Sequence, residues 1–174
     1  MNKSYHRLPQ FIRILQQSPS AVAGVSGSPD YPAISGKISF YQTQFGVLVS
    51  AEVSGLPRSD SNCGARIFAF HIHSGGSCTG SGSDSFADAL THYDPHGCAH
   101  PYHAGDLVPL WGNGGYAFAV FLTDRFSVSE IIGKTVIIHE NPDDFTTQPA
   151  GNAGKKIACG VIEQYPSHRH PCNC

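Results

Sequence analysis

The chain has 174 residues, which is long enough for one domain with a sizeable hydrophobic core. Only 14% of its residues are charged and its formal net charge is −2, so no basic surface indicates nucleic acid as a partner. No apolar run reaches membrane-spanning length, and we expect no membrane partner.

The first part of the chain passes from a broken N-terminal stretch to a regular strand pattern. Serine, glycine and proline recur so often through residues 1–32 that we predict a flexible lead-in, with a short helix over residues 10–17. From residue 33 apolar and polar residues alternate, which predicts strands over 38–41 and 47–53 joined by a turn at 43–46. These strands form a predicted hairpin.

The next predicted strand, over residues 65–73, ends in two histidines. A strand has a period of two residues, so His71 and His73 project from one face and Phe70 and Ile72 from the other. The apolar face is therefore predicted to enter the core. Two neutral imidazoles on a rigid strand form half of a site for copper or zinc.

A long loop over residues 74–110 follows and contains a second cluster of metal-binding side chains. Four histidines and two aspartates lie between residues 92 and 106. Three imidazoles and one carboxylate complete the tetrahedral shell of a structural zinc site. The alternative is a solvated polar loop whose histidines bind nothing, which the density of histidines disfavours.

The second half of the chain adds further predicted strands and a second long loop. The strands are expected at residues 116–122, 135–139 and 158–164, with a helical turn near 128–132 and the loop at 140–155. His139 ends one of these strands. A single histidine after an apolar run is usually structural, so its value as a ligand depends on the other histidines.

Together these elements predict an all-β domain over residues 33–165. The expected architecture is a Greek-key β-sandwich or flattened eight-stranded barrel with two long functional loops. Residues 166–174 are predicted to be an exposed tail that contains histidines and cysteines.

Several short motifs follow one another around the histidines. They are His71-x-His73, His92-Tyr93-Asp94-Pro95, His103-Ala104-Gly105-Asp106-Leu107, Val136-Ile137-Ile138-His139-Glu140, Gly151-Asn152-Ala153-Gly154 and Ala158-Cys159-Gly160-Val161-Ile162. In this order they resemble the signature blocks of the copper–zinc superoxide dismutase family, over about residues 47–163.

The resemblance implies a pair of metal sites. The implied ligands are His71, His73, His92 and His139 for copper, and His92, His103, Asp106 and one more histidine for zinc. The ring of His92 would bridge the two metals as an imidazolate. The family usually places its middle zinc histidine eight residues after the bridging one, so His100 is preferred and His96 is the alternative.

The resemblance also assigns roles outside the ligand sets. Asp143 matches a carboxylate that links ligands of the two metals and fixes the orientation of their rings. Cys78 and Cys159 match the family disulfide. Lys156 stands where the family normally has an arginine beside copper, so positive charge is kept but the planar fork of a guanidinium is not.

The implied activity is the conversion of superoxide to dioxygen and hydrogen peroxide, with copper and zinc as cofactors and with His92 and Lys156 as catalytic residues. The alternative is a metal-binding module on the same fold, for copper or zinc binding, storage or delivery, with little dismutase activity. The family includes monomers and dimers, so a homodimer stays open. No signal peptide is recognisable, which predicts a cytoplasmic location, with secretion or cell-surface display as the alternative.

Overall fold

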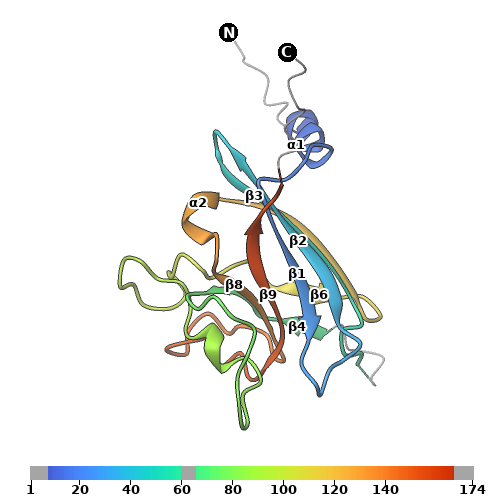
Figure 1. Ribbon diagram of the computed structural model, residues 1–174, viewed down its shortest axis with the longest axis vertical. Helices are drawn as coiled ribbons and strands as arrows, with labels where there is room; N and C mark the ends of the chain where they lie inside the picture. The colour runs from blue at the N-terminus through green and yellow to red at the C-terminus, as the bar shows by residue number, and fades with distance from the viewer. Residues whose placement is uncertain (1–7, 60–65, 167–174) are drawn as a thin grey trace, which may run out of the picture.

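The structure, a computed structural model, describes residues 8–59 and 66–166 (Figure 1). Its strands are β1 (Ala21–Gly27), β2 (Ser35–Thr43), β3 (Gly46–Ser54), β4 (Arg66–Phe68), β5 (Phe70–His73), β6 (Leu110–Gly112), β7 (Tyr116–Thr123), β8 (Thr135–His139) and β9 (Lys156–Gln164). The helical elements are α1 (Leu8–Leu15), a 3₁₀ turn (Ala87–Ala89) and α2 (Val128–Ile131). The all-β prediction is confirmed. The predicted tail beyond Pro166 lies outside the described residues.

The main sheet is antiparallel and curled, with the strand order β5-β8-β9-β1-β2-β3-β7 (Figure 1). β4 and β6 pair separately as a two-stranded sheet. The last strand, β9, lies between β8 and β1, so strands that are distant in the sequence become neighbours. This order agrees with the predicted Greek-key barrel.

The core forms where alternate residues of the strands point inward. In the β2–β3 hairpin, Ile38 and Phe40 face the interior together with Val47 and Val49, and Ile162 of β9 joins the same cluster. Each of these side chains is fully buried, and such burial contributes roughly 1.5–3 kcal/mol per large apolar side chain. The hairpin lies where the alternation predicts it.

β1 differs from the sequence prediction. Its residues are expected in the flexible lead-in, but they pair with β2 on one side and with β9 on the other. Ala21, Ala23 and Val25 are buried in the core. The alternation is hard to detect because two of these residues are alanines and Gly24 stands among them, and both types are depleted in strands.

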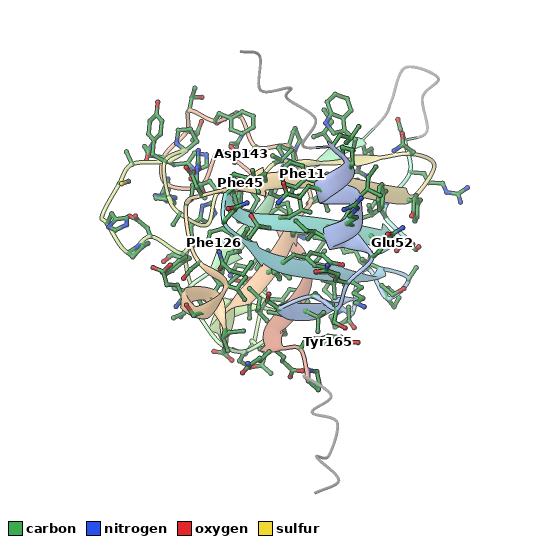
Figure 2. The ribbon with its side chains drawn as sticks, turned by 90° about the horizontal axis from the view of Figure 1, so that it is seen from above. Phe11, Phe45, Glu52, Phe126, Asp143 and Tyr165 are labelled. Carbon is green, nitrogen blue, oxygen red and sulfur yellow. A yellow bond between two sulfur atoms is a disulfide. The ribbon has the colours of Figure 1, made fainter. Side chains whose placement is uncertain are left out.

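The N-terminal helix α1 lies close to its predicted place and begins two residues earlier. Phe11 on this helix packs edge-on against Phe45 in the β2–β3 turn, with ring centroids 6.4 Å apart (Figure 2). Across the described ranges, we find no helix with the length and apolar character needed to span a membrane.

The predicted strand over residues 65–73 is interrupted at Ala69. The N–H of Ala69 donates to the carbonyl of Asn141, and its own carbonyl accepts from the N–H of His139. As a result β4 pairs with β6, whereas β5 pairs with β8 inside the main sheet. Phe70 and Ile72 enter the core as predicted, which leaves the histidines of β5 on the opposite face.

The first long loop lies along that opposite face. Isolated β-bridges join His71 to Asp106 and His73 to His92, so the loop backbone runs beside β5. A disulfide between Cys78 and Cys159 ties the loop to β9, as the resemblance implies. The histidines of the strand and of the loop are therefore held against each other by both backbone and covalent contacts.

The central position of β1 leads to a stability prediction. Val25→Ala removes buried methyl groups from the core and is expected to lower the free energy of unfolding by about 2 kcal/mol. Val22→Ala, on the half-buried outer side of the same strand, is expected to cost less than about 1 kcal/mol. Urea unfolding of the metal-free protein followed by circular dichroism measures both. Equal small effects would mean that β1 is a loose lead-in.

Candidate metal centre

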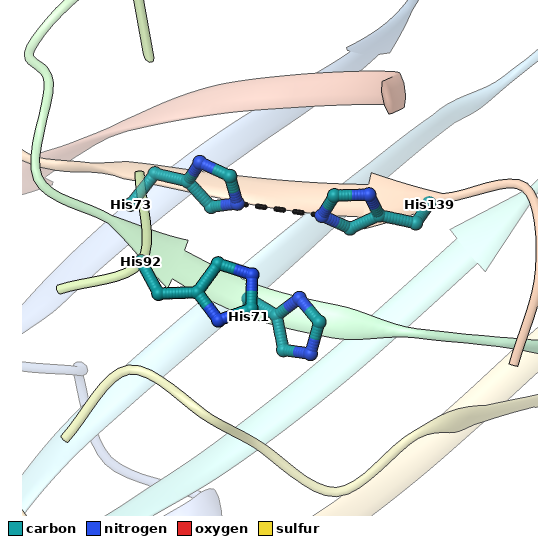
Figure 3. Close-up of side chains that lie close together, drawn as sticks. All are labelled: His71, His73, His92 and His139. Atoms are coloured by element: carbon teal, nitrogen blue, oxygen red, sulfur yellow. Dashed lines mark hydrogen bonds between the residues drawn. The ribbon is translucent and has the colours of Figure 1, made fainter. Parts of the chain in front are cut away.

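Four buried histidines converge from three parts of the chain (Figure 3). His71 and His73 come from β5, His139 from the end of β8 and His92 from the first long loop. Their ring nitrogens lie within 4.8 Å of one another. The Nε2 atoms of His73 and His139 are 3.3 Å apart, a separation at which one ion could contact both. We call these four residues the first set.

A second set lies directly beside the first. It contains His92, His100, His103 and Asp106, all buried and also within 4.8 Å of one another through their ligand atoms. The Asp106 carboxylate lies 2.7 Å from His92 Nδ1, 3.1 Å from His100 Nδ1 and 3.3 Å from His103 Nδ1. His96 is exposed and outside the set, so the structure brings His100 into this group and leaves His96 at the surface.

The ring of His92 belongs to both sets. Its Nδ1 faces Asp106 and His103 in the second set, at 2.7 Å and 3.3 Å. Its Nε2 is buried and makes no hydrogen bond. Because the two nitrogens lie on opposite edges of one imidazole, this ring can contact two ions at once.

Among the residues that the structure describes, three buried ring nitrogens have no hydrogen-bond partner: His71 Nδ1, His92 Nε2 and His100 Nδ1. The Nδ1 of His100 lies near Asp106, but not in the direction that a hydrogen bond requires. An unpaired buried polar atom costs about 1–3 kcal/mol. A bound cation would use each of these lone pairs, so the residues fit metal ions in both sets.

Asp143 is hydrogen-bonded to one histidine of each set. Its carboxylate accepts a hydrogen bond from His71 Nε2 and another from His100 Nε2, both at 2.8 Å. Burial alone would raise the pKa of Asp143, but these bonds and one from the Phe145 N–H lower it to about 2. The carboxylate is therefore ionised, and it directs the free Nδ1 of each ring toward its own metal set.

Two backbone carbonyls orient the remaining rings of the first set. His73 Nδ1 donates to the carbonyl of Leu90 at 2.8 Å, and His139 Nδ1 donates to that of Gly154 at 3.2 Å. Both rings thus present Nε2 as the free lone pair. Sequence analysis missed these acceptors because any residue supplies a carbonyl, and no motif marks it.

Burial keeps three histidines of the first set neutral. It lowers the pKa of His71 and of His73, and it lowers the pKa of His139 to about 3. A neutral imidazole has the lone pair that a metal requires, whereas a protonated one does not. His71, His73 and His139 are therefore in their metal-binding form at neutral pH.

A cleft of about 1040 Å³ opens onto the first set. His73, His92 and His139 lie on its wall, and Lys156 and Asp84 line it as well. Lys156 begins β9 and pairs in register with His139, which places it beside the histidines. Asp84 is a loop residue without periodic pattern or motif, so sequence analysis did not identify it.

Comparison with known proteins gives one consistent result. The sequence model of the family described as copper/zinc superoxide dismutase (SODC) matches residues 34–162. Cu-Zn superoxide dismutase 2 of Aquifex aeolicus is 35% identical over 142 residues, covering 73% of this chain and 78% of the relative. The Cu-Zn superoxide dismutase of Legionella pneumophila is 33% identical over 159 residues, covering 84% and 91%. Cu-Zn superoxide dismutase A of Xenopus laevis is 32% identical, covering 82% and 95%.

A substitution at Gly151 tests whether Asp143 helps to orient His100 in the second set. Gly151 has a positive φ of 64°, and a Cβ here would collide with the Asp143 carboxylate and approach His100 Nε2. Gly151→Ala is therefore expected to weaken zinc binding by roughly 10–100-fold. Gly114→Ala is the matched control, because Gly114 has a φ of 63° and open space around its Cβ position.

Competition with a chromophoric chelator measures the zinc affinity of both variants. Gly114→Ala should bind zinc as the wild type does, although its backbone is strained to a similar degree. Equal zinc affinity in the two variants would contradict a supporting role for Asp143.

Proposed function

The chain belongs to the copper/zinc superoxide dismutase family, and from this premise we propose which of its residues hold the metals and act on the substrate. The protein is an oxidoreductase that acts on superoxide, with copper and zinc as cofactors. The net reaction consumes two superoxide anions and two protons and yields one dioxygen and one hydrogen peroxide.

The proposed copper ligands are the first set, and the proposed zinc ligands are the second. The observation that carries this assignment is the ring of His92, whose two nitrogens face different sets. Imidazoles suit copper in both of its oxidation states, and three imidazoles with one carboxylate suit a closed zinc site. His100 is preferred over His96 because its Nδ1 is buried and unpaired beside Asp106.

Bound copper supplies the one-electron oxidation and reduction of superoxide, and bound zinc has a structural role. His92 is proposed to handle the proton. Its Nε2 has no hydrogen-bond partner within residues 8–59 and 66–166, and its ring lies on the wall of the cleft, where an anion arrives. A proton taken up at Nε2 can be passed to the reduced anion, and a second proton from water completes the hydrogen peroxide that leaves.

Lysines of the cleft are proposed to attract the anionic substrate. Lys134, Lys155 and Lys156 line the cleft, although the whole chain has a formal net charge of −2. Asp30, Asp84 and Asp94 line the same cleft, so attraction depends on the cation that stands nearest the first set, whose field a cleft with low-dielectric walls focuses on an arriving anion. Lys156 is the proposed catalytic cation because it lies opposite His139 in the β8–β9 register.

Metal content and superoxide decay together test this function. The wild type is expected to bind one copper and one zinc per chain and to accelerate superoxide decay, measured by pulse radiolysis. His100→Ala is expected to weaken zinc binding at least about tenfold because it removes a ligand. His96→Ala is the control and should retain both metals, since His96 is exposed and outside the second set.

Two results would contradict the proposal. Loss of zinc from His96→Ala with retention in His100→Ala would reverse the ligand assignment. A wild type that binds copper in the first set without accelerating decay would support the alternative, a metal-binding module with little activity.

We also propose that the chain forms a homodimer through the outer face of β7. Large side chains alternate along this face, and Leu122 at its end shares a groove of about 350 Å³ with Tyr102, Val108 and Phe145. β6 leads into β7 through the Asn113–Tyr116 bridge and adds Trp111. The β7 patch comprises Tyr102, Val108, Trp111, Tyr116, Phe118, Val120, Leu122 and Phe145, which are 38–70% exposed.

The size of the β7 patch favours a second copy as its partner. An aromatic side chain has roughly 150–250 Å² of surface, so the patch exposes on the order of 700 Å² of apolar area. This is close to the ~800 Å² that each partner buries in a standard interface. Such a large apolar area is uncommon on a monomer, and a two-fold axis would cover it on both chains.

Phe118→Glu tests the dimer, because it places a charge at a site that is 59% exposed on the β7 patch. The wild type is expected to sediment as a dimer at about 50 µM and the variant as a monomer, with a dissociation constant raised at least about 100-fold. Ile132→Glu, an exposed apolar site outside the patch, should stay dimeric. A monomeric wild type, or equal behaviour of the two variants, would reject this interface.

The cytoplasmic location stays a prediction. The Cys78–Cys159 disulfide is typical of proteins in oxidising compartments, so secretion remains the alternative. Fractionation of the cells that produce the protein distinguishes the two.

A further inference from the structure

The ammonium group of Lys156 is not free in the cleft. Its Nζ donates to the Asp84 carboxylate at 2.8 Å and to the carbonyl of Phe86 at 3.1 Å. The Lys156 side chain is only 14% exposed, whereas that of Asp84 is 42% exposed. The charge that is proposed to attract superoxide is therefore paired with an opposite charge before any substrate arrives.

The position of Asp84 is fixed by the loop that contains it. One carboxylate oxygen accepts the hydrogen bond from Lys156, and the other accepts from the Phe86 N–H at 3.0 Å. Phe86 is buried against Ile137 and Cys159, where the disulfide ties the loop to β9. Asp84 is thus held near Lys156 by a hydrophobic and a covalent anchor, and does not depend on the ion pair alone.

The ion pair lies on the wall that an anion must pass. Asp84, Lys156, His73 and His139 all line the same cleft. Burial alone would raise the pKa of Asp84, but hydrogen bonds from Lys156 and the Phe86 N–H lower it overall, so the carboxylate is ionised at neutral pH. Asp84 then cancels much of the field of Lys156 and repels small anions at short range.

We propose that Asp84 is a positioning residue that restrains the ammonium of Lys156 and limits the attraction of the cleft for small anions, superoxide among them. This inference rests on the proposed function. In this inference the cation of the cleft is an ion pair of Lys156 with Asp84, whereas the sequence analysis considered Lys156 alone. Removal of the carboxylate charge should leave the ammonium unpaired and able to turn toward the anion.

The test is azide binding to the copper- and zinc-loaded protein, followed by visible absorption. Asp84→Asn is expected to bind azide about fivefold more tightly than the wild type, because it adds one net positive charge to the cleft wall. Its rate of superoxide decay should also fall more steeply as ionic strength rises. Asp84→Ser removes the same charge with a smaller side chain and should behave in the same way.

Asp88→Asn is the matched control. Asp88 lies on the same loop, is exposed, and accepts a hydrogen bond from Thr79 Oγ1 without contacting Lys156. This variant changes the net charge of the chain by the same amount, so it should leave azide affinity within about twofold of the wild type. Copper and zinc content is measured for every variant first, so that only fully loaded proteins are compared.

A double substitution separates restraint of Lys156 from a general charge effect. In a Lys156→Met background, Asp84→Asn should tighten azide binding clearly less than it does in the wild type, since the two residues are coupled. An unchanged azide affinity in both Asp84 variants, an equal gain in Asp88→Asn, or a full effect in the Lys156→Met background would overturn the inference. A wild type that neither binds azide nor accelerates superoxide decay would instead reject the proposed function.

Discussion

The structure depends on one shared imidazole. The ring of His92 is held by the Asp106 carboxylate at Nδ1 and by a backbone bridge to His73, and its Nε2 is left without a partner among the other histidines. Without this ring the two sets would be separate groups of buried side chains. With it, the proposed copper site and the proposed zinc site share one ring, which lies on the wall of the cleft.

The barrel supplies the rigidity that this arrangement requires. β5 and β8 are paired strands of the main sheet, so the backbone hydrogen bonds between them fix the relative positions of their histidines. Asp143 then connects the rings of His71 and His100 from the second long loop. The unpaired buried nitrogens are costly in the metal-free protein, and bound ions that satisfy them stabilise the folded state.

The sequence predicted those features that depend on local periodicity. The two-residue spacing of His71 and His73 gave the correct faces of β5, and the β2–β3 hairpin followed from alternation. The resemblance supplied the pairing of Cys78 with Cys159, which spacing alone leaves open. Other features depend on tertiary contacts, which leave no periodic signal.

The structural features that the sequence did not predict are those set by contacts between distant parts of the chain. β1 has alanine and glycine at positions where valine or isoleucine would mark a strand, so only its pairing with β2 and β9 identifies it. The interruption at Ala69 arises from hydrogen bonds to Asn141 and His139, which lie 72 and 70 residues further along the chain. Asp84 meets Lys156 only because the loop is folded back onto β9.

A crystal structure of the copper- and zinc-loaded protein, with anomalous scattering data on both sides of the copper and zinc absorption edges, tests the central claim most directly. A ring shared by two metal ions predicts a copper peak beside Nε2 of His92 and a zinc peak beside its Nδ1. A single peak, or two peaks of which only one lies beside the His92 ring, would contradict it.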